Sequence, residues 1–93
     1  RRSSDLGTLS KAVFVGIIEE TIRHEMRKYK KGNVMIESMS IIYIKTVPIE
    51  STIEVHYEML DVGRYFAKLE VTMINNGEKV ANALVICQMF DGF

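Results

Sequence analysis

The hydrophobic repeat of this sequence changes once, near Gly32-Asn33, from the period of a helix to the period of a strand. From Leu9 to about Tyr29, apolar residues recur every four positions, which predicts one long helix. These residues are Phe14, Ile18, Ile22 and Met26. Ser10 or Thr8 can cap the start of this helix, and Gly32 is well placed just after its last turn. A single helix followed only by strands predicts an α+β fold.

Four extended runs rich in Val, Ile, Tyr, Phe and Met follow the helix, and they predict four strands. The runs are Val34 to Ile44, Thr52 to Leu60, Tyr65 to Asn75 and Lys79 to Phe90. Apolar and charged residues alternate in the second and third runs, so one face of the sheet is expected to be wet. Asn76-Gly77 supplies the positive backbone dihedrals of a tight hairpin turn. We therefore expect an antiparallel meander that curls around the helix and has exposed edges.

The predicted helix has more apolar surface than one small domain is expected to bury. The first half of the predicted helix is apolar nearly all round, and since a surface helix would not tolerate this, we expect that half to be enclosed. The apolar residues beside the four-residue repeat are Leu9, Ala12, Val13, Val15, Gly16 and Ile17. A chain of 93 residues buries only roughly 60–65% of its unfolded surface, so association would stabilise it.

Composition narrows the classes of function. Residues 1–93 are expected to form a single domain, and a start at Arg1 in place of methionine predicts a fragment of a larger multidomain protein. The formal net charge is zero, which removes the global electrostatic argument for nucleic acid or an anionic membrane. The longest apolar stretch is shorter than the ~20 residues of a membrane span. The single cysteine, Cys87, excludes an internal disulfide and fits the cytoplasm. No metal or cofactor is predicted.

Three short segments resemble the hotdog superfamily, in particular thioesterases of the phenylacetate type. They are Leu6-Gly7-Thr8-Leu9-Ser10 before the helix, Lys45-Thr46-Val47-Pro48-Ile49-Glu50-Ser51 between strands, and the "gly-arg" turn Asp61-Val62-Gly63-Arg64-Tyr65. More narrowly, the first segment and the ending Val80 to Met89 resemble the C-terminal hotdog domain of bacterial proteins that also carry DRTGG and CBS domains. The resemblance implies an acyl-coenzyme A ligand and a homodimer or higher even oligomer. In such dimers the sheets join edge to edge, and the ligand site lies at the interface near the helix start. A complete hotdog has one more strand before the helix, which is expected upstream or replaced by a partner.

The resemblance also points to Glu19 as a catalytic residue. In the phenylacetate-type enzymes an acidic residue follows the His of a His-Gly-Gly motif by nine positions, and here Ser10 takes the His place and Glu19 the acid place. That acid acts as nucleophile or general base, while backbone N–H groups at the helix start polarise the thioester carbonyl. The resemblance therefore assigns substrate binding to Gly7, Thr8, Ser10 and Lys11. The alternative is that Glu19 or Glu20 faces solvent or pairs with Arg23, as ordinary helix charges do.

The motifs leave three functions open. Ser10-Lys11-Ala12 replaces His-Gly-Gly, so the close backbone approach that glycine permits is lost. This favours a ligand-sensing and dimerising domain that binds acyl-coenzyme A without hydrolysing it. The alternative is a thioesterase that acts on a small or aromatic acyl thioester through Glu19, and a pure dimerisation domain is a third possibility.

Overall fold

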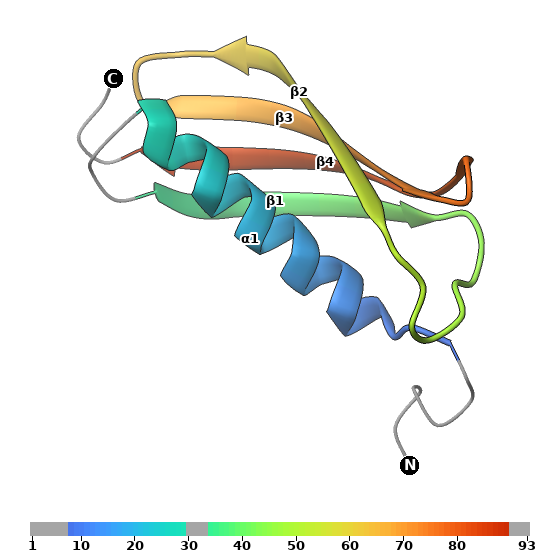
Figure 1. Ribbon diagram of the computed structural model, residues 1–93. Helices are drawn as coiled ribbons and strands as arrows, with labels where there is room; N and C mark the ends of the chain where they lie inside the picture. Colours follow the sequence, from blue (N-terminus) through green and yellow to red (C-terminus); the bar gives the residue numbers. More distant parts are fainter. Residues whose placement is uncertain (1–7, 30–33, 90–93) are drawn as a thin grey trace.

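The computed structural model of the chain describes residues 8–29 and 34–89. Helix α1 (Lys11–Tyr29) is followed by β1 (Val34–Tyr43), β2 (Glu54–Val62), β3 (Phe66–Asn75) and β4 (Glu78–Met89). The strands form one antiparallel sheet, and α1 lies across one of its faces (Figure 1). The predicted α+β arrangement of one helix followed by four strands is confirmed.

The order of the strands in the sheet is β1-β4-β3-β2, so the predicted meander is wrong in one place. β1 pairs with β4 at one edge, whereas β2 pairs with β3 at the opposite edge. The tight turn at 76–77 forces β3 and β4 to be neighbours, and it has the positive φ values predicted for Asn76 (53°) and Gly77 (78°). The longer connection at 44–53 imposes no such restriction, and it carries the chain from one edge of the sheet to the other.

The start of α1 is fixed by contacts with this connection. The backbone N–H of Leu9 donates to the carbonyl of Val47 at 2.7 Å, and Thr8 forms an antiparallel bridge with Pro48. These contacts keep residues 8 and 9 extended, so the helix begins at Lys11 and not at the predicted Leu9. Ser10 is the cap, because its carbonyl and its hydroxyl both accept the N–H of Val13, at 3.1 and 3.4 Å.

The core lies between α1 and the inner face of the sheet. The predicted stripe on the helix is buried almost completely, against alternate residues of β3 and β4. The buried residues of these three elements include Phe14, Ile18, Ile22, Met26, Ala67, Leu69, Val71, Met73, Ala81, Ala83, Val85, Cys87 and Met89. The intervening residues of β3, such as Lys68 and Glu70, are only partly buried on the other face, so the predicted wet face is confirmed. Gly32 and Phe90, which were predicted to end the helix and the last strand, lie outside the described residues.

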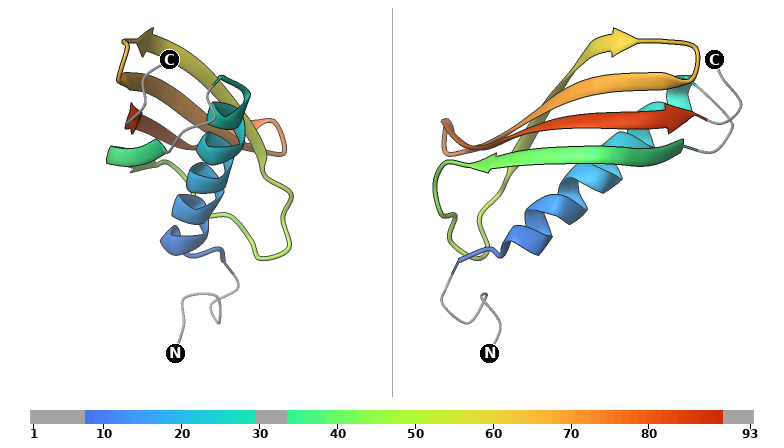
Figure 2. Two further views of the ribbon diagram at one scale, coloured as in Figure 1. Left: turned by 90° about the vertical axis from the view of Figure 1, so that its left-hand side faces the viewer. Right: turned by 180° about the vertical axis from the view of Figure 1, so that it is seen from behind.

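The first half of α1 is not enclosed within one chain, contrary to expectation. Val13 is 41% exposed, and Val15, Gly16 and Ile17 are only partly buried. Figure 2 shows the physical reason, because the sheet lies on one side of the helix and leaves the other sides open. The apolar residues outside the core stripe are therefore available to a further surface.

A buried carboxylate that sequence reasoning missed ties β2 to the helix. Glu25 is only 6% exposed, and it accepts a hydrogen bond from the phenol of Tyr57. The ammonium nitrogen of Lys28 lies 3.2 Å from the same carboxylate. Burial of a carboxylate is costly unless it is paired, so these contacts stabilise the attachment of the edge strand. The signal in the sequence was the position of Glu25, seven residues after Ile18 and three after Ile22, on the core face of the helix.

Replacing Tyr57 by phenylalanine tests this attachment. Tyr57→Phe removes a hydrogen bond from a buried charged group, and we expect the free energy of unfolding to fall by about 1–2 kcal/mol. The matched control is Tyr65→Phe, at an exposed tyrosine, which should change the free energy by less than about 0.5 kcal/mol. Urea denaturation of both variants measures the difference. Equal, small effects would contradict the proposed role of the Glu25–Tyr57 contact.

Candidate functional site

A cavity of about 600 Å³ opens between the start of α1 and the end of β1. It is lined by Leu9, Ser10, Lys11, Ala12, Phe14, Tyr43, Ile44, Lys45 and Thr46. Most of this lining is apolar, and the first turn of a helix also leaves backbone N–H groups without partners in the helix. A mostly apolar cavity with a few convergent polar groups is the usual form of a small-molecule site.

The walls of this cavity are held by the residues that follow β1. The backbone N–H groups of Ile44 and Lys45 both donate to the carbonyl of Val80, at 2.8 and 3.2 Å, so the chain stays attached to β4 beyond the end of the strand. Val47 is fully buried, and its carbonyl holds Leu9 at the entrance to the helix. The end of β1 and the start of α1 are thus fixed to each other, and the cavity lies between them.

Aromatic rings and ammonium groups give the cavity its chemistry. The rings of Phe14 and Tyr43 are 5.7 Å apart and tilted by 53°, a favourable geometry for an aromatic pair. The ammonium nitrogen of Lys11 lies 5.1 Å from the centre of the Tyr43 ring, within cation–π range. Lys45 forms an ion pair with Glu78 at 2.6 Å. The lining contains two lysines and no acidic residue.

The predicted binding residues fall partly in this cavity. Ser10 and Lys11 line it, whereas Thr8 is not part of the lining and forms the bridge to Pro48. Gly7 lies outside the described residues. Their role in binding stays a prediction. Sequence reasoning missed Tyr43, which belongs to the apolar face of β1 and whose contact with the helix start depends on the strand order.

Glu19 lies in a different place from the other predicted residues. It is partly buried and lines a second cavity, of about 240 Å³, together with Ile22, Arg23 and residues 34–36 of β1. Nine residues of helix separate it from Ser10, which is about 13.5 Å along the axis. One chain therefore does not bring Glu19 and the amides at the helix start to the same reacting atom.

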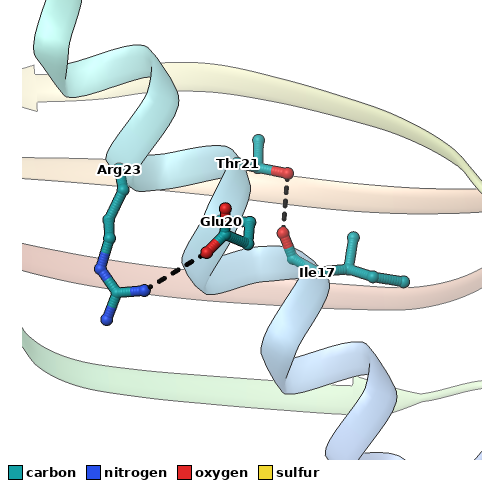
Figure 3. A network of polar contacts seen from close by, with 4 residues as sticks. All are labelled: Ile17, Glu20, Thr21 and Arg23. Carbon is teal, nitrogen blue, oxygen red and sulfur yellow. Dashed lines mark hydrogen bonds and ion pairs between the residues drawn. The ribbon is translucent and has the colours of Figure 1, made fainter.

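The alternative pairing with Arg23 is found for Glu20 and not for Glu19. Arg23 lies 3.6 Å from a carboxylate oxygen of Glu20, and the hydroxyl of Thr21 donates to the carbonyl of Ile17 at 2.8 Å (Figure 3). Among the residues that the structure describes, no ion pair involves Glu19. Its carboxylate is thus available to a ligand or to a second chain.

Within residues 8–29 and 34–89, no group of three His, Cys, Asp or Glu side chains is arranged to hold a metal ion. The one helix of this described part is not apolar enough over a sufficient length to cross a bilayer.

Comparison with known proteins gives one family. The profile of the family described as Thioesterase superfamily matches residues 6–82. The chain is 36% identical over 89 residues to the uncharacterized protein YtoI of Bacillus subtilis (strain 168). That match covers 96% of this chain and 20% of YtoI, so the chain spans a fifth of the length of this curated relative.

Solved structures agree on the fold. A thioesterase from Thermus thermophilus, solved with coenzyme A and Zn, matches with a TM-score of 0.78 and 24% identity over 97% of this chain and 74% of that chain. The BH1999 gentisyl-coenzyme A thioesterase matches with a TM-score of 0.82 and 12% identity over 92% of this chain and 77% of that chain. Together with the family match, these likenesses confirm the expected hotdog fold.

Cys87 is not suited to be a nucleophile in this fold. Its side chain is fully buried on the inner face of β4, and desolvation by this burial raises the pKa of the Cys87 thiol from 9.0 to about 11. Only the thiolate is nucleophilic. A raised pKa makes the thiolate rarer at every pH below about 11, so the thiol behaves as a small apolar side chain.

Labelling of this thiol tests its burial. Raising the pKa of the thiol from 9.0 to about 11 lowers the thiolate fraction at pH 8 by about 100-fold. Burial also limits the access of a reagent to the sulfur. We expect an aromatic disulfide reagent to label the native chain at least about 100-fold more slowly than the chain in 6 M guanidinium, roughly in proportion to the thiolate fraction. Labelling at similar rates in both states would contradict the burial of Cys87.

Proposed function

Because this chain belongs to the thioesterase superfamily, we propose that it binds an acyl-coenzyme A thioester in the cavity at the start of α1. The observation that carries this proposal is the apolar cavity of about 600 Å³ beside the first turn of the helix. Its aromatic walls suit an acyl group. The N–H groups of the first turn other than that of Val13, which Ser10 caps, suit a carbonyl oxygen. Two structural relatives give further support, one solved with coenzyme A and one named as a gentisyl-coenzyme A thioesterase.

We propose in addition that two copies of the chain form the complete site. β1 is an open edge of ten residues whose only partner in the described sheet is β4, and open edges readily pair with another chain. Ala12, Gly16, Glu19 and Arg23 follow one another at helical spacing and share one side of α1. Glu19 and Arg23 line a cavity with residues of β1, so this side of α1 faces the edge of the sheet that β1 forms.

A two-fold axis near the middle of the first half of α1 would relate the two helices in an antiparallel pair. In one chain, Ser10 and Glu19 are separated by about 13.5 Å along the helix. Because the axis crosses the helix about midway between these two residues, it brings Glu19 of one copy beside Ser10 and Lys11 of the other. The partner would also cover the exposed Val13 and the open sides of the helix. In such a dimer the second copy would enclose the first half of α1, which one chain leaves open.

Within this site we favour binding over hydrolysis, as part of a sensing domain. Lys11 and Ala12 stand where the phenylacetate-type enzymes have two glycines, so a thioester carbonyl meets a Cβ atom at each position. The chain matches 20% of the length of YtoI, which agrees with one domain of a longer protein, and we propose that this longer protein is regulatory and of the DRTGG and CBS kind. The unpaired Cys87 agrees with a cytoplasmic location.

Hydrolysis is the second candidate, because Glu19 is partly buried in a cavity and is not engaged by Arg23. In that reaction Glu19 accepts a proton from a water molecule whose oxygen attacks the thioester carbonyl. Helix N–H groups bind the resulting oxyanion. The C–S bond then breaks, the acyl group leaves as a carboxylic acid, and the thiolate of coenzyme A takes up a proton.

Benzoyl-coenzyme A separates binding from hydrolysis. We expect it to raise the melting temperature of the chain, with a stabilisation of about 2.7 kcal/mol at 100 times its dissociation constant. Release of free thiol is followed in the same sample. Thiol release that is lost in Glu19→Gln, with the thermal shift kept, would establish the hydrolase. A shift without thiol release is the result that we expect, and the absence of any shift would contradict the proposed function.

Gly16 provides a test of the paired helices. A Cβ atom added at Gly16 meets no atom within 4 Å in one chain, so Gly16→Leu should leave the monomer folded and even favour its helix. In the proposed dimer the same side chain enters the helix interface. We expect Gly16→Leu to be monomeric in sedimentation velocity, whereas Glu20→Leu, at an exposed position of the same helix, stays dimeric. A dimeric Gly16→Leu variant would rule out this interface.

A further inference from the structure

Lys11 occupies a position that the helix alone does not favour. It is the first residue of α1, and the first turn contains no acidic residue to balance it. The N-terminus of a helix carries a partial positive charge, so a cation there is unfavourable. A lysine at this position therefore calls for another interaction.

The structure gives Lys11 a defined place at the wall of the cavity. Its ammonium nitrogen lies 5.1 Å from the centre of the Tyr43 ring. The same ring packs against Phe14 inside the cavity lining. The ammonium group is thus held at the border between the apolar wall and solvent, where it can meet a charged part of a ligand whose apolar part contacts the two rings.

The other cation of the lining differs from Lys11 in its charge balance. Lys45 is neutralised by the carboxylate of Glu78 at 2.6 Å. No ion pair of Lys11 is found among the described residues, and no acidic residue lines the cavity. Within one chain, the cavity therefore combines an apolar interior with one positive charge, at Lys11, that no carboxylate of the same chain balances.

We propose that Lys11 and Tyr43 form an anion subsite that determines which ligands this cavity accepts, and that the ligand is an amphipathic anion. Its apolar acyl group packs against Phe14 and Tyr43, and its anionic group contacts the ammonium of Lys11. This inference rests on the proposed binding of a thioester in the same cavity. The anionic group is either a phosphate of the coenzyme A carrier or a carboxylate on the acyl group itself.

Three thioesters distinguish the two sources of negative charge. Benzoyl-coenzyme A carries phosphates, S-benzoyl-N-acetylcysteamine carries no charge, and S-(4-carboxybenzoyl)-N-acetylcysteamine carries only a carboxylate on the acyl group. Their dissociation constants are measured by calorimetry for the whole chain and for Lys11→Met, Lys11→Arg and Lys79→Met. Lys79 is an exposed lysine outside the lining of the cavity, and it serves as the matched control.

The subsite predicts a selective loss of affinity. Lys11→Met should raise the dissociation constant of the anionic ligand by about tenfold. Lys11→Arg should keep it within about threefold, and Lys79→Met should leave it unchanged. Loss confined to benzoyl-coenzyme A assigns the charge to a phosphate, and loss confined to the carboxybenzoyl thioester assigns it to the acyl group. Because Lys11 is exposed, the variant should fold, and its melting temperature without ligand checks this.

Two results would overturn the subsite in different ways. If the chain binds thioesters and every dissociation constant is the same in Lys11→Met, the anion subsite is wrong and the proposed function stands. If none of the three thioesters binds the unaltered chain, the proposed function fails and the subsite fails with it.

Discussion

The structure depends on the burial of one helical stripe against one face of a four-stranded sheet. Ile18, Ile22 and Met26 are almost fully buried in this contact, as are the facing residues of β3 and β4. Because the stripe is narrow and the sheet is open, this contact stabilises the fold without covering the remaining sides of the helix. The exposed half of α1 and the free edge at β1 both follow from it, and each of these surfaces is suited to a second chain.

The cavity is a consequence of the same arrangement. α1 must begin where the connection between β1 and β2 crosses from one edge of the sheet to the other, and the bond from Leu9 to Val47 fixes this meeting point. The rings of Phe14 and Tyr43 are thereby brought together beside the first turn. A site built from backbone contacts and large side chains in this way is formed before any ligand arrives, which lowers the cost of binding.

Local signals in the sequence were sufficient to predict the helix and the strands, but not which strands lie side by side. The period of the apolar residues, the cap at Ser10 and the turn at Asn76-Gly77 each act within a few residues, and all were predicted. The strand order was not, because the position of β1 beside β4 depends on pairing between distant residues. For the same reason Tyr43 and the Glu25–Tyr57 contact were missed, whereas Ser10 and Lys11, which line the cavity, were predicted through the resemblance of the segment before the helix. Glu19 was predicted in the same way, and its distance from them became evident only in the structure.

Hydrogen exchange measured with and without saturating benzoyl-coenzyme A tests the central claim most directly, because it reports where the ligand acts. Our account predicts slower exchange of the backbone amides of residues 9–14 and 43–46, which surround the cavity, and little change at the hairpin turn of residues 75–78. Unchanged exchange at the helix start in a chain that has bound the ligand, with protection elsewhere in the sheet, would contradict it.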